Sequence, residues 1–386
     1  MIIRIVSSPA KIKSDKAKGK AGAQKVFRLG EFFCGPGGIG LGAIKSQVSS
    51  NGVTYSFAHA WANDFDPDTC ETYRRNICPR EPESVVCGDI RKIDPKQFGP
   101  IEAFAYGFPC NDFSIVGEHK GFDGEFGPLY SYGVRIIDRL KPKIIFAENV
   151  GGIASANEGK AFKQILSDLE NAGNKYNLSV NLYRFEEYGI PQARHRIIII
   201  GIEKSLGLRF KVPAPTFKIK TSRSAIEEPP IKKNAANHEL TKQSATVVER
   251  LTHTKPGENA WNADLPRHLQ LNVKQTRLSH IYKRLDPNKP SYTITGSGGG
   301  GTHGYHWKEP RALTNRERAR LQTFPDSYIF EGSKESVRKQ IGMAVSPDMA
   351  GIIFTCILKT FAGIDYPSVN PSFGSQLELF ANGAKK

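Results

Sequence analysis

Cys110 lies in the stretch GFPCNDFS, directly after Pro109 and at the end of a short apolar run. A cysteine in such a loop is usually a small apolar residue. A thiolate is also an intrinsically strong nucleophile, which nearby positive charge can activate. Which interpretation holds depends on the polar groups that the fold brings to the same loop.

Two further segments carry carboxyl and guanidinium groups. Glu148 and Asn149 follow the apolar run KIIFA. A carboxyl group at the end of a buried strand is unfavourable unless it is paired or its pKa is raised, and a solvated strand end is the alternative. In PQARHRIIIIGI, Gln192, Arg194 and Arg196 alternate, which places them on one face of a strand. Two arginines on one face suit a phosphate or a base carbonyl, with a solvated sheet edge as the alternative.

A glycine-rich turn, FFCGPGGIGLG at 32–42, lies between an apolar run and a helical segment. Its spacing differs from the G-x-G-x-x-G of dinucleotide-binding folds. Asp64 ends the next apolar run, AHAWAND, and Asp89 ends the third, VVCGD. A carboxylate at each of these strand ends could bind a ribose diol and an adenine amino group, respectively. Together they indicate an adenosine-containing ligand; a plain tight turn with helix-capping aspartates is the alternative.

The elements that position these residues are short apolar runs separated by helical segments. The expected strands lie in KVFRLGEFF, YSFAHAWAND, SVVCGDI, IEAFAYGF, PKIIFAENV, YNLSVNLYRF and RHRIIIIGI, with helices in YSYGVRIIDRLK and GKAFKQILSDLENAG. This alternation predicts an α/β fold with a largely parallel sheet covered on both faces. Because ligands bind at the carboxyl ends of strands in such folds, the candidate residues fall on one edge.

The pattern changes outside this region. Residues 1–26 form a lysine-rich arm that could touch phosphates or be simply disordered. Residues 204–310 are rich in Pro, Gly, Asn and Thr and predict a smaller, irregular domain. Helices return in 311–365, with a capping box at Thr314 and Glu317 and a last helix starting at Ser346-Pro347. We expect 27–203 to form the main domain and 366–386 a tail.

The chain of 386 residues carries a net charge of +16, which favours a polyanionic partner over a mere solubility device. Between residues 203 and 310 there are 18 Lys and Arg against nine Asp and Glu. No membrane-spanning run or signal peptide is apparent, so we expect a cytoplasmic protein without a membrane association. The six cysteines are scattered, which favours neither disulfides nor a thiolate metal site.

The order of these segments resembles the DNA (cytosine-5) methyltransferase family of the bacterial restriction-modification type. FFCGPGG is similar to its methyl-donor loop, GFPCNDFS to its catalytic Pro-Cys loop, AENV to its Glu-Asn-Val element and QARHR to its Gln-x-Arg-x-Arg element. RALTNRERARLQTFPDSY and QIGMAVSP resemble later elements, so the match covers about residues 27–360. The resemblance implies a Rossmann-like, class I S-adenosylmethionine-dependent methyltransferase fold with a target recognition domain at 204–310.

The resemblance also implies a mechanism and assigns residues to it. Cys110 would add to C6 of cytosine so that C5 can accept a methyl group from S-adenosyl-L-methionine, giving S-adenosyl-L-homocysteine. Glu148 would act at N3, supported by Asn149, with Arg194 and Arg196 holding O2 and the nearby backbone. Water is expected to remove the C5 proton, and no metal is required.

Binding residues follow in the same way. The predicted methyl-donor site comprises Phe33, Gly35, Gly37, Gly38, Asp64, Phe65, Asp89, Ile90, Pro109, Leu129, Ala344 and Val345. The predicted DNA contacts are Asn111, Ser114, Gln192, Thr293 and Thr295. Because C6 is inaccessible inside a duplex, the target base must be flipped out, while the basic domain reads neighbouring bases.

The expected partners are double-stranded DNA and a cognate restriction endonuclease, for a monomer associated with the nucleoid. The chain departs from the family pattern at Asn111 (commonly Gln), Met343 (Asn), Phe126 (Arg) and Glu31 (Asp). Three alternatives are an RNA cytosine methyltransferase, a silent DNA-binding regulator and a nicotinamide-dependent dehydrogenase. The basic insert counts against the RNA methyltransferase, and the complete set of chemical residues counts against the silent regulator. The glycine spacing counts against the dehydrogenase.

Overall fold

The computed structural model describes residues 23–108, 129–154, 159–272, 279–299 and 301–373. Its larger domain contains a sheet with the strand order β2-β3-β1-β5-β6-β9-β7, and β4 pairs with β3. The strands are β1 (Ala23–Phe32), β2 (Gln47–Ser50), β3 (Val53–Asp64), β4 (Val85–Cys87), β5 (Ala103–Gly107), β6 (Ile144–Val150), β7 (Tyr176–Arg184) and β9 (His195–Glu203). Pairing is parallel except for β2 on β3 and for β9 between β6 and β7. The prediction of a mixed, mostly parallel sheet is therefore confirmed.

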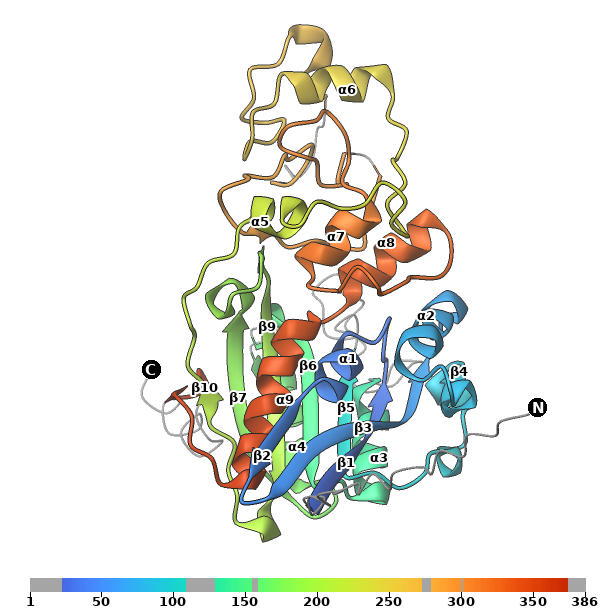
Figure 1. Ribbon diagram of the computed structural model, residues 1–386, viewed down its shortest axis with the longest axis vertical. Coiled ribbons are helices and arrows are strands. Elements are labelled where there is room, and N and C mark those ends of the chain that lie inside the picture. The colour runs from blue at the N-terminus through green and yellow to red at the C-terminus, as the bar shows by residue number, and fades with distance from the viewer. Residues whose placement is uncertain (1–22, 109–128, 155–158, 273–278, 300, 374–386) are drawn as a thin grey trace, which may run out of the picture.

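Helices cover both faces of this sheet (Figure 1). They are α1 (Gly38–Ile44) and α9 (Pro347–Ala362) on one face, α3 (Tyr130–Leu140) and α4 (Lys160–Asn171) on the other, and α2 (Pro67–Ile77) beside β4. The isoleucine run of β9 shows why both faces are apolar. Ile198 and Ile200 pack in the core under α9, whereas Ile197 and Ile199 pack in the core with α3 and α4. Side chains of a strand alternate between faces, so a continuous apolar run serves both cores.

The smaller domain has little regular structure. It contains α5 (Ser222–Glu227), α6 (Ala245–Thr252) and β11 (Ser291–Tyr292), which pairs with β8 (Gln192–Ala193). Its main chain is held partly by Arg284, a buried side chain that donates to the carbonyl oxygens of Leu251, Thr254, His306, Trp307 and Glu309. These side-chain donors satisfy buried carbonyl groups that would otherwise need hydrogen bonds from a neighbouring strand.

Helices α7 (Asn315–Leu321) and α8 (Lys334–Met343) lie between the two domains (Figure 1). The capping box at Thr314 and Glu317 is confirmed, since each side chain bonds the backbone N–H of the other residue. Ser346 caps α9 as predicted. The stretch Lys334–Ala362 is apolar and long enough to span a membrane by length and composition, but 72% of its most apolar window is buried inside the protein. This is the behaviour of a core helix.

Contacts near the predicted boundaries at 203 and 366 connect the flanking segments to the larger domain. Phe210 and Val212 pack in the core of the larger domain, and β10 (Val212–Pro213) pairs with β12 (Ser368–Val369). The chain therefore leaves the larger domain some residues after 203. Residues 366–373 are attached to that domain, because β12 pairs with β10 and because Tyr366 and Phe373 pack against the cores on the two faces of the sheet.

Candidate active site

Glu148 and Arg196 form an ion pair at one end of the sheet. They project from the adjacent antiparallel strands β6 and β9, in which Arg196 lies opposite Val150. The Arg196 Nε lies 2.9 Å from the Glu148 Oε1, and the side chains are 14% and 12% exposed. Of the possibilities that the sequence left open for this strand-end glutamate, the structure shows the paired one. The pair is accessible enough to meet a ligand.

Asn149 connects this pair to the cysteine loop. Its Nδ2 donates to the carbonyl oxygen of Phe108 at 2.9 Å, and its Oδ1 accepts from the backbone N–H of Val150 at 2.8 Å. Gly107 lies beside the Glu148 carboxylate, where a Cβ would be 3.2 Å from Oε2. Phe108 is the last described residue of this segment, so Pro109, Cys110, Asn111, Ser114 and Phe126 lie outside the described residues. The structure thus brings the start of the cysteine loop to the Glu148–Arg196 pair.

The other two polar residues of QARHR are buried. Arg194 is 2% exposed and donates to the carbonyl oxygens of Ile294 at 3.3 Å and Gly342 at 3.1 Å. Burial lowers its pKa to about 9, which leaves it charged at neutral pH. Gln192 is fully buried and bonds the Leu321 carbonyl and the Ile294 N–H. In this structure Arg194 and Gln192 join the two domains, and only Arg196 faces Glu148. Their predicted contacts with substrate stay predictions.

The glycine-rich turn has the backbone form that its composition suggests. Phe33, Gly35 and Gly37 have φ values of 52°, 54° and 88°, in the left-handed region that favours glycine. Asp64, at the end of β3, accepts the N–H of Gly35 at 3.0 Å and that of Asp66 at 3.1 Å. Burial raises the pKa of this carboxyl. The carboxylate fixes the turn and lies where the turn meets β3.

Three predicted donor-site residues, Phe65, Asp89 and Ile90, follow the ends of the neighbouring strands β3 and β4. Phe65 is 62% exposed, an unusual position for a phenyl ring, while Ile90 is buried. Asp89 caps a short 3₁₀ turn and pairs with Arg91, whose hydrogen bond lowers the pKa of Asp89 to about 2. Leu129 packs against the core below. An exposed ring beside a carboxylate and an open glycine turn fit an adenosine moiety, and no atom lies within 4 Å of where a Gly35 Cβ would stand.

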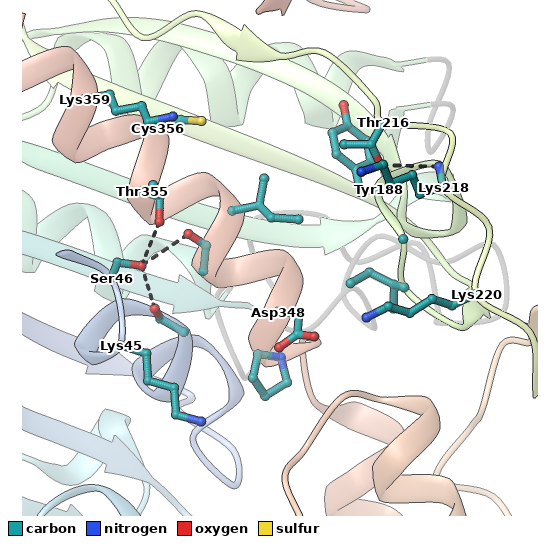
Figure 2. Close-up of a pocket in the computed structure, with 16 residues that line it drawn as sticks. Lys45, Ser46, Tyr188, Thr216, Lys218, Lys220, Asp348, Thr355, Cys356 and Lys359 are labelled. Atoms are coloured by element: carbon teal, nitrogen blue, oxygen red, sulfur yellow. Dashed lines mark hydrogen bonds between the residues drawn. The ribbon is translucent and has the colours of Figure 1, made fainter. Parts of the chain in front are cut away.

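The closing element packs directly on this turn. Ala344 and Val345 are buried, and a Cβ added at Gly38 would collide with the carbonyl oxygen of Val345. Beneath them, the Ser46 hydroxyl at the end of α1 bonds the carbonyl oxygens of Gly42 at 2.8 Å and Gly351 at 3.2 Å (Figure 2). α1 and α9 therefore hold the turn and the closing element as one unit.

An open cavity of about 610 Å³ lies beside α9, and Figure 2 draws the residues that line it. Four lysines line it, together with Asp348 and the side of the helix: Lys45, Lys218, Lys220 and Lys359. None of the predicted site residues lines this cavity, so it is separate from the Glu148–Arg196 pair.

Thr293 and Thr295 follow β11 at the junction of the domains. The Thr293 hydroxyl donates to the Ala193 carbonyl oxygen at 2.7 Å, and Thr295 is exposed beside Ser297. Gly342 packs against the backbone of Thr295 and Gly296. The predicted contacts of Thr293 and Thr295 with DNA stay predictions. Within the described ranges, no group of three or more His, Cys, Asp or Glu side chains could hold a metal ion.

Sequence reasoning missed several residues that build the site. The Asn63 amide donates to the carbonyl oxygens of Val86 and Gly88 and so joins β3 to the loop that carries Asp89. Gln322 donates to the carbonyl oxygens of Ile341 and Ala344 beneath the closing element. These two amide side chains bond main-chain groups that are distant in sequence, so no local sequence pattern reveals their role. For Asn63, the one available signal is its position directly before Asp64.

The fold is that of the class I methyltransferases. A solved DNA modification methyltransferase from an E. coli prophage superposes with a TM-score of 0.67 at 23% identity, covering 86% of this chain and 99% of that protein. The methyltransferase EhMeth of Entamoeba histolytica superposes with a TM-score of 0.58 at 17% identity, covering 87% and 98%. At these identities the likeness shows the fold.

Sequence comparison defines the family. The model of the C-5 cytosine-specific DNA methylases matches residues 27–359. The type II methyltransferase M.BbvI of Brevibacillus brevis is 60% identical over 351 residues, which are 89% of this chain and 94% of the relative. M.NgoFVII of Neisseria gonorrhoeae is 40% identical over 341 residues, 86% of each protein. The chain belongs to the C-5 cytosine-specific DNA methylase family and is a DNA cytosine-5 methyltransferase, as predicted.

Proposed function

We propose that this enzyme methylates C5 of a flipped-out cytosine at a specific site in duplex DNA, through a covalent bond between Cys110 and C6. The observation that carries the proposal is the hydrogen bond from Asn149 to Phe108. It fixes the residue two positions before Cys110 against the strand end that carries Glu148. An acid and a cysteine loop in that relation suit nucleophilic addition to a pyrimidine.

In this mechanism the Cys110 thiolate forms a bond to C6 while Glu148 donates a proton or a hydrogen bond to N3. Arg196 hydrogen-bonds O2 of the base and holds the Glu148 carboxyl in place through their 2.9 Å contact. When bound, S-adenosyl-L-methionine would supply an electrophilic methyl group to C5 and would leave as S-adenosyl-L-homocysteine. Loss of the C5 proton to water then lets the thiolate leave C6. Arg194 acts as a positioning residue, because its guanidinium bonds main chain on both sides of the domain junction.

The methyl donor would be held by the glycine turn and the strand ends beside it. Asp64 would bind the ribose diol and Asp89 the adenine amino group, with the Phe65 and Ile90 side chains on the ring faces. The backbone of Ala344 and Val345, Leu129 and Pro109 would complete the pocket. This assignment is supported by the exposed Phe65 ring and by the positive φ angles at Phe33, Gly35 and Gly37.

The wider role follows from the relatives. Type II methyltransferases belong to restriction-modification systems, and we propose that this enzyme protects cytoplasmic DNA from a cognate endonuclease and acts as a monomer. The basic, irregular domain would read bases in the major groove, and its lysines and arginines would contact phosphates. Asn111, Ser114, Thr293 and Thr295 are proposed to contact the DNA around the target.

Bisulfite sequencing of DNA from cells that express the protein tests the proposal. We expect one short sequence context in which cytosine becomes protected. Cys110→Ser should abolish protection, whereas Cys356→Ser, in α9 away from the site, should retain it. Duplexes with 5-fluorocytosine at the target should trap a covalent complex with the wild-type enzyme, because fluorine cannot leave as the C5 proton does. Protection by Cys110→Ser at the wild-type level would refute the nucleophile.

A further inference from the structure

Arg318 differs from the other buried arginines of the domain junction. Arg284 donates to five main-chain carbonyl groups, and Arg316 donates to those of Ala236, Pro325 and Tyr328. Arg318 is equally buried, at 3% exposure, but only its Nε has a partner, the Leu313 carbonyl oxygen at 3.3 Å. Among the described residues, its two terminal nitrogens have no hydrogen-bond or ion-pair partner. A buried charge of this kind is costly unless a ligand completes it.

The terminal part of Arg318 borders a cavity of about 230 Å³ in the smaller domain. We call it the Arg318 cavity; its described lining residues are Ser279, His280, Lys283, Tyr292, Thr293, Ile294, Thr295, Thr302, His303, Gly304 and Arg318. None of these is acidic. Hydroxyl groups and cations dominate the polar lining, which is the composition of a site for an anion.

The neighbouring charges agree with this reading. Glu317, next to Arg318 in sequence, is held in a bidentate pair by Arg311 and also caps α7. Burial lowers the pKa of Arg318 to about 10, so the group remains charged at neutral pH. Burial and the proximity of Arg318 and Arg338 lower the pKa of His303 to about 4. The described lining of the cavity thus contains cations and no carboxylate, while Glu317 and Glu335, which act on Arg318 and His303, lie outside the lining.

The position of the cavity relates it to the substrate. Its wall at Thr293 is bonded to Ala193, which precedes Arg196 by three residues. At about 3.3 Å per residue, three residues span at most about 10 Å, so this wall lies within about 10 Å of the backbone at Arg196. Since phosphates follow one another at about 3.4 Å of helix rise per strand, that span corresponds to at most about three nucleotides.

We propose that the Arg318 cavity binds one phosphodiester group of the DNA, within about three nucleotides of the target cytosine, and that both terminal nitrogens of Arg318 donate to its oxygens. Lys283 and the hydroxyls of Ser279 and Thr302 would complete the contact. The inference rests on the proposed function, because the phosphate belongs to the DNA that the enzyme methylates. It adds an anchoring residue for the flipped strand in the smaller domain.

The test compares Arg318→Met with the wild-type enzyme in equilibrium binding to a short duplex that carries the methylated site. Losing a charge-assisted bidentate contact should weaken binding about tenfold to a hundredfold. The slope of log K against log salt concentration should fall by about 0.9, the value for one phosphate. Lys211→Met is the matched control, since it removes an exposed charge that is paired with Asp365 and lies directly before β10 in the larger domain. It should leave affinity and slope unchanged.

A second measurement identifies the phosphate. In duplexes with one neutral methylphosphonate linkage at successive positions, the wild-type enzyme should lose affinity at a position within a few nucleotides of the target. Arg318→Met should be insensitive at that same position. If Arg318→Met does not fold, Arg318→Lys replaces it, with a severalfold loss at that linkage and an unchanged slope.

Two results would overturn the inference: a folded Arg318 variant with wild-type affinity and slope, or a scan in which no linkage is coupled to Arg318. The second result would favour a base edge as the ligand. Methyl transfer by the wild-type enzyme is measured on the same duplexes. Its absence would overturn the proposed function, while the salt slopes would still decide whether Arg318 contacts DNA.

Discussion

Glu148 and Arg196 meet across two antiparallel strands, with the arginine Nε 2.9 Å from the carboxylate Oε1. Neither side chain could hold this geometry alone. β6 presents the acid, and β9 returns in the opposite direction to present the guanidinium. The antiparallel insertion of β9 between β6 and β7 thus places a cation at the carboxyl edge of a mostly parallel sheet.

Glu148→Gln should lower kcat by about 10²-fold to 10⁴-fold, which is the usual contribution of a positioned acid or base to the rate. The amide keeps the shape of the side chain and can still accept from Arg196, but it cannot transfer a proton to N3. DNA affinity should change little. Single-turnover methyl transfer and equilibrium binding, measured on the same duplex, separate the two effects. A parallel fall in both would mean that Glu148 serves binding instead.

Gly38→Ala should weaken methyl-donor binding and destabilise the protein by about 1–3 kcal/mol, because the added Cβ meets the Val345 carbonyl oxygen. Donor titration and thermal unfolding measure the two effects. Gly99→Ala is the matched control, since nothing lies within 4 Å of its added Cβ. Equal behaviour of the two variants would show that the turn and the closing element move apart freely.

Arg284→Met should destabilise the smaller domain by about 3 kcal/mol or more, because it leaves several buried carbonyl groups without donors. Limited proteolysis should then cleave within the smaller domain first. Arg209→Met, which removes an exposed arginine, should stay within about 0.5 kcal/mol of the wild type. If Arg284→Met unfolded at the same temperature as the wild type, the stabilising role of Arg284 would be contradicted.

The sequence predicts those features that have a local signature. Alternating apolar runs indicated the strands of the sheet, and the capping box at Thr314 was readable because its partner lies three residues away. The shared face of Gln192, Arg194 and Arg196 was only partly right. β8 and β9 are separate strands with different partners, so Gln192 and Arg194 turn into the domain junction while Arg196 reaches Glu148.

Features that depend on distant contacts could not be predicted. Phe210 and Val212 lie in a stretch with the composition of a loop, yet they cover the larger sheet because β12 pairs there. Likewise, the sequence of α7 does not reveal how many main-chain carbonyl groups each of its arginines will bond. Arg316 bonds three of them, whereas Arg318 bonds one. Such outcomes are set by tertiary packing.

Glu31 should make stability depend on pH. It is buried at the end of β1, where it accepts a hydrogen bond from Tyr73, and burial raises its pKa from 4.5 to about 7. The folded protein therefore binds more protons than the unfolded chain between these pH values, so this group's contribution to stability falls as pH rises from about 4.5 to 7. The loss amounts to about 3 kcal/mol.

Glu31→Gln, neutral at every pH, should remove this contribution. His59, which bonds Tyr73 and whose pKa burial lowers to about 4, acts in the opposite direction, since its contribution falls as pH falls below its ordinary value of 6.5. The difference between the variant and the wild type in urea unfolding, measured across pH 4.5 to 8, isolates the glutamate from the histidine. Glu71→Gln, at an exposed helix position, is the control. Identical pH profiles for Glu31→Gln and the wild type would mean that the carboxyl ionises in the folded protein as readily as in the unfolded chain.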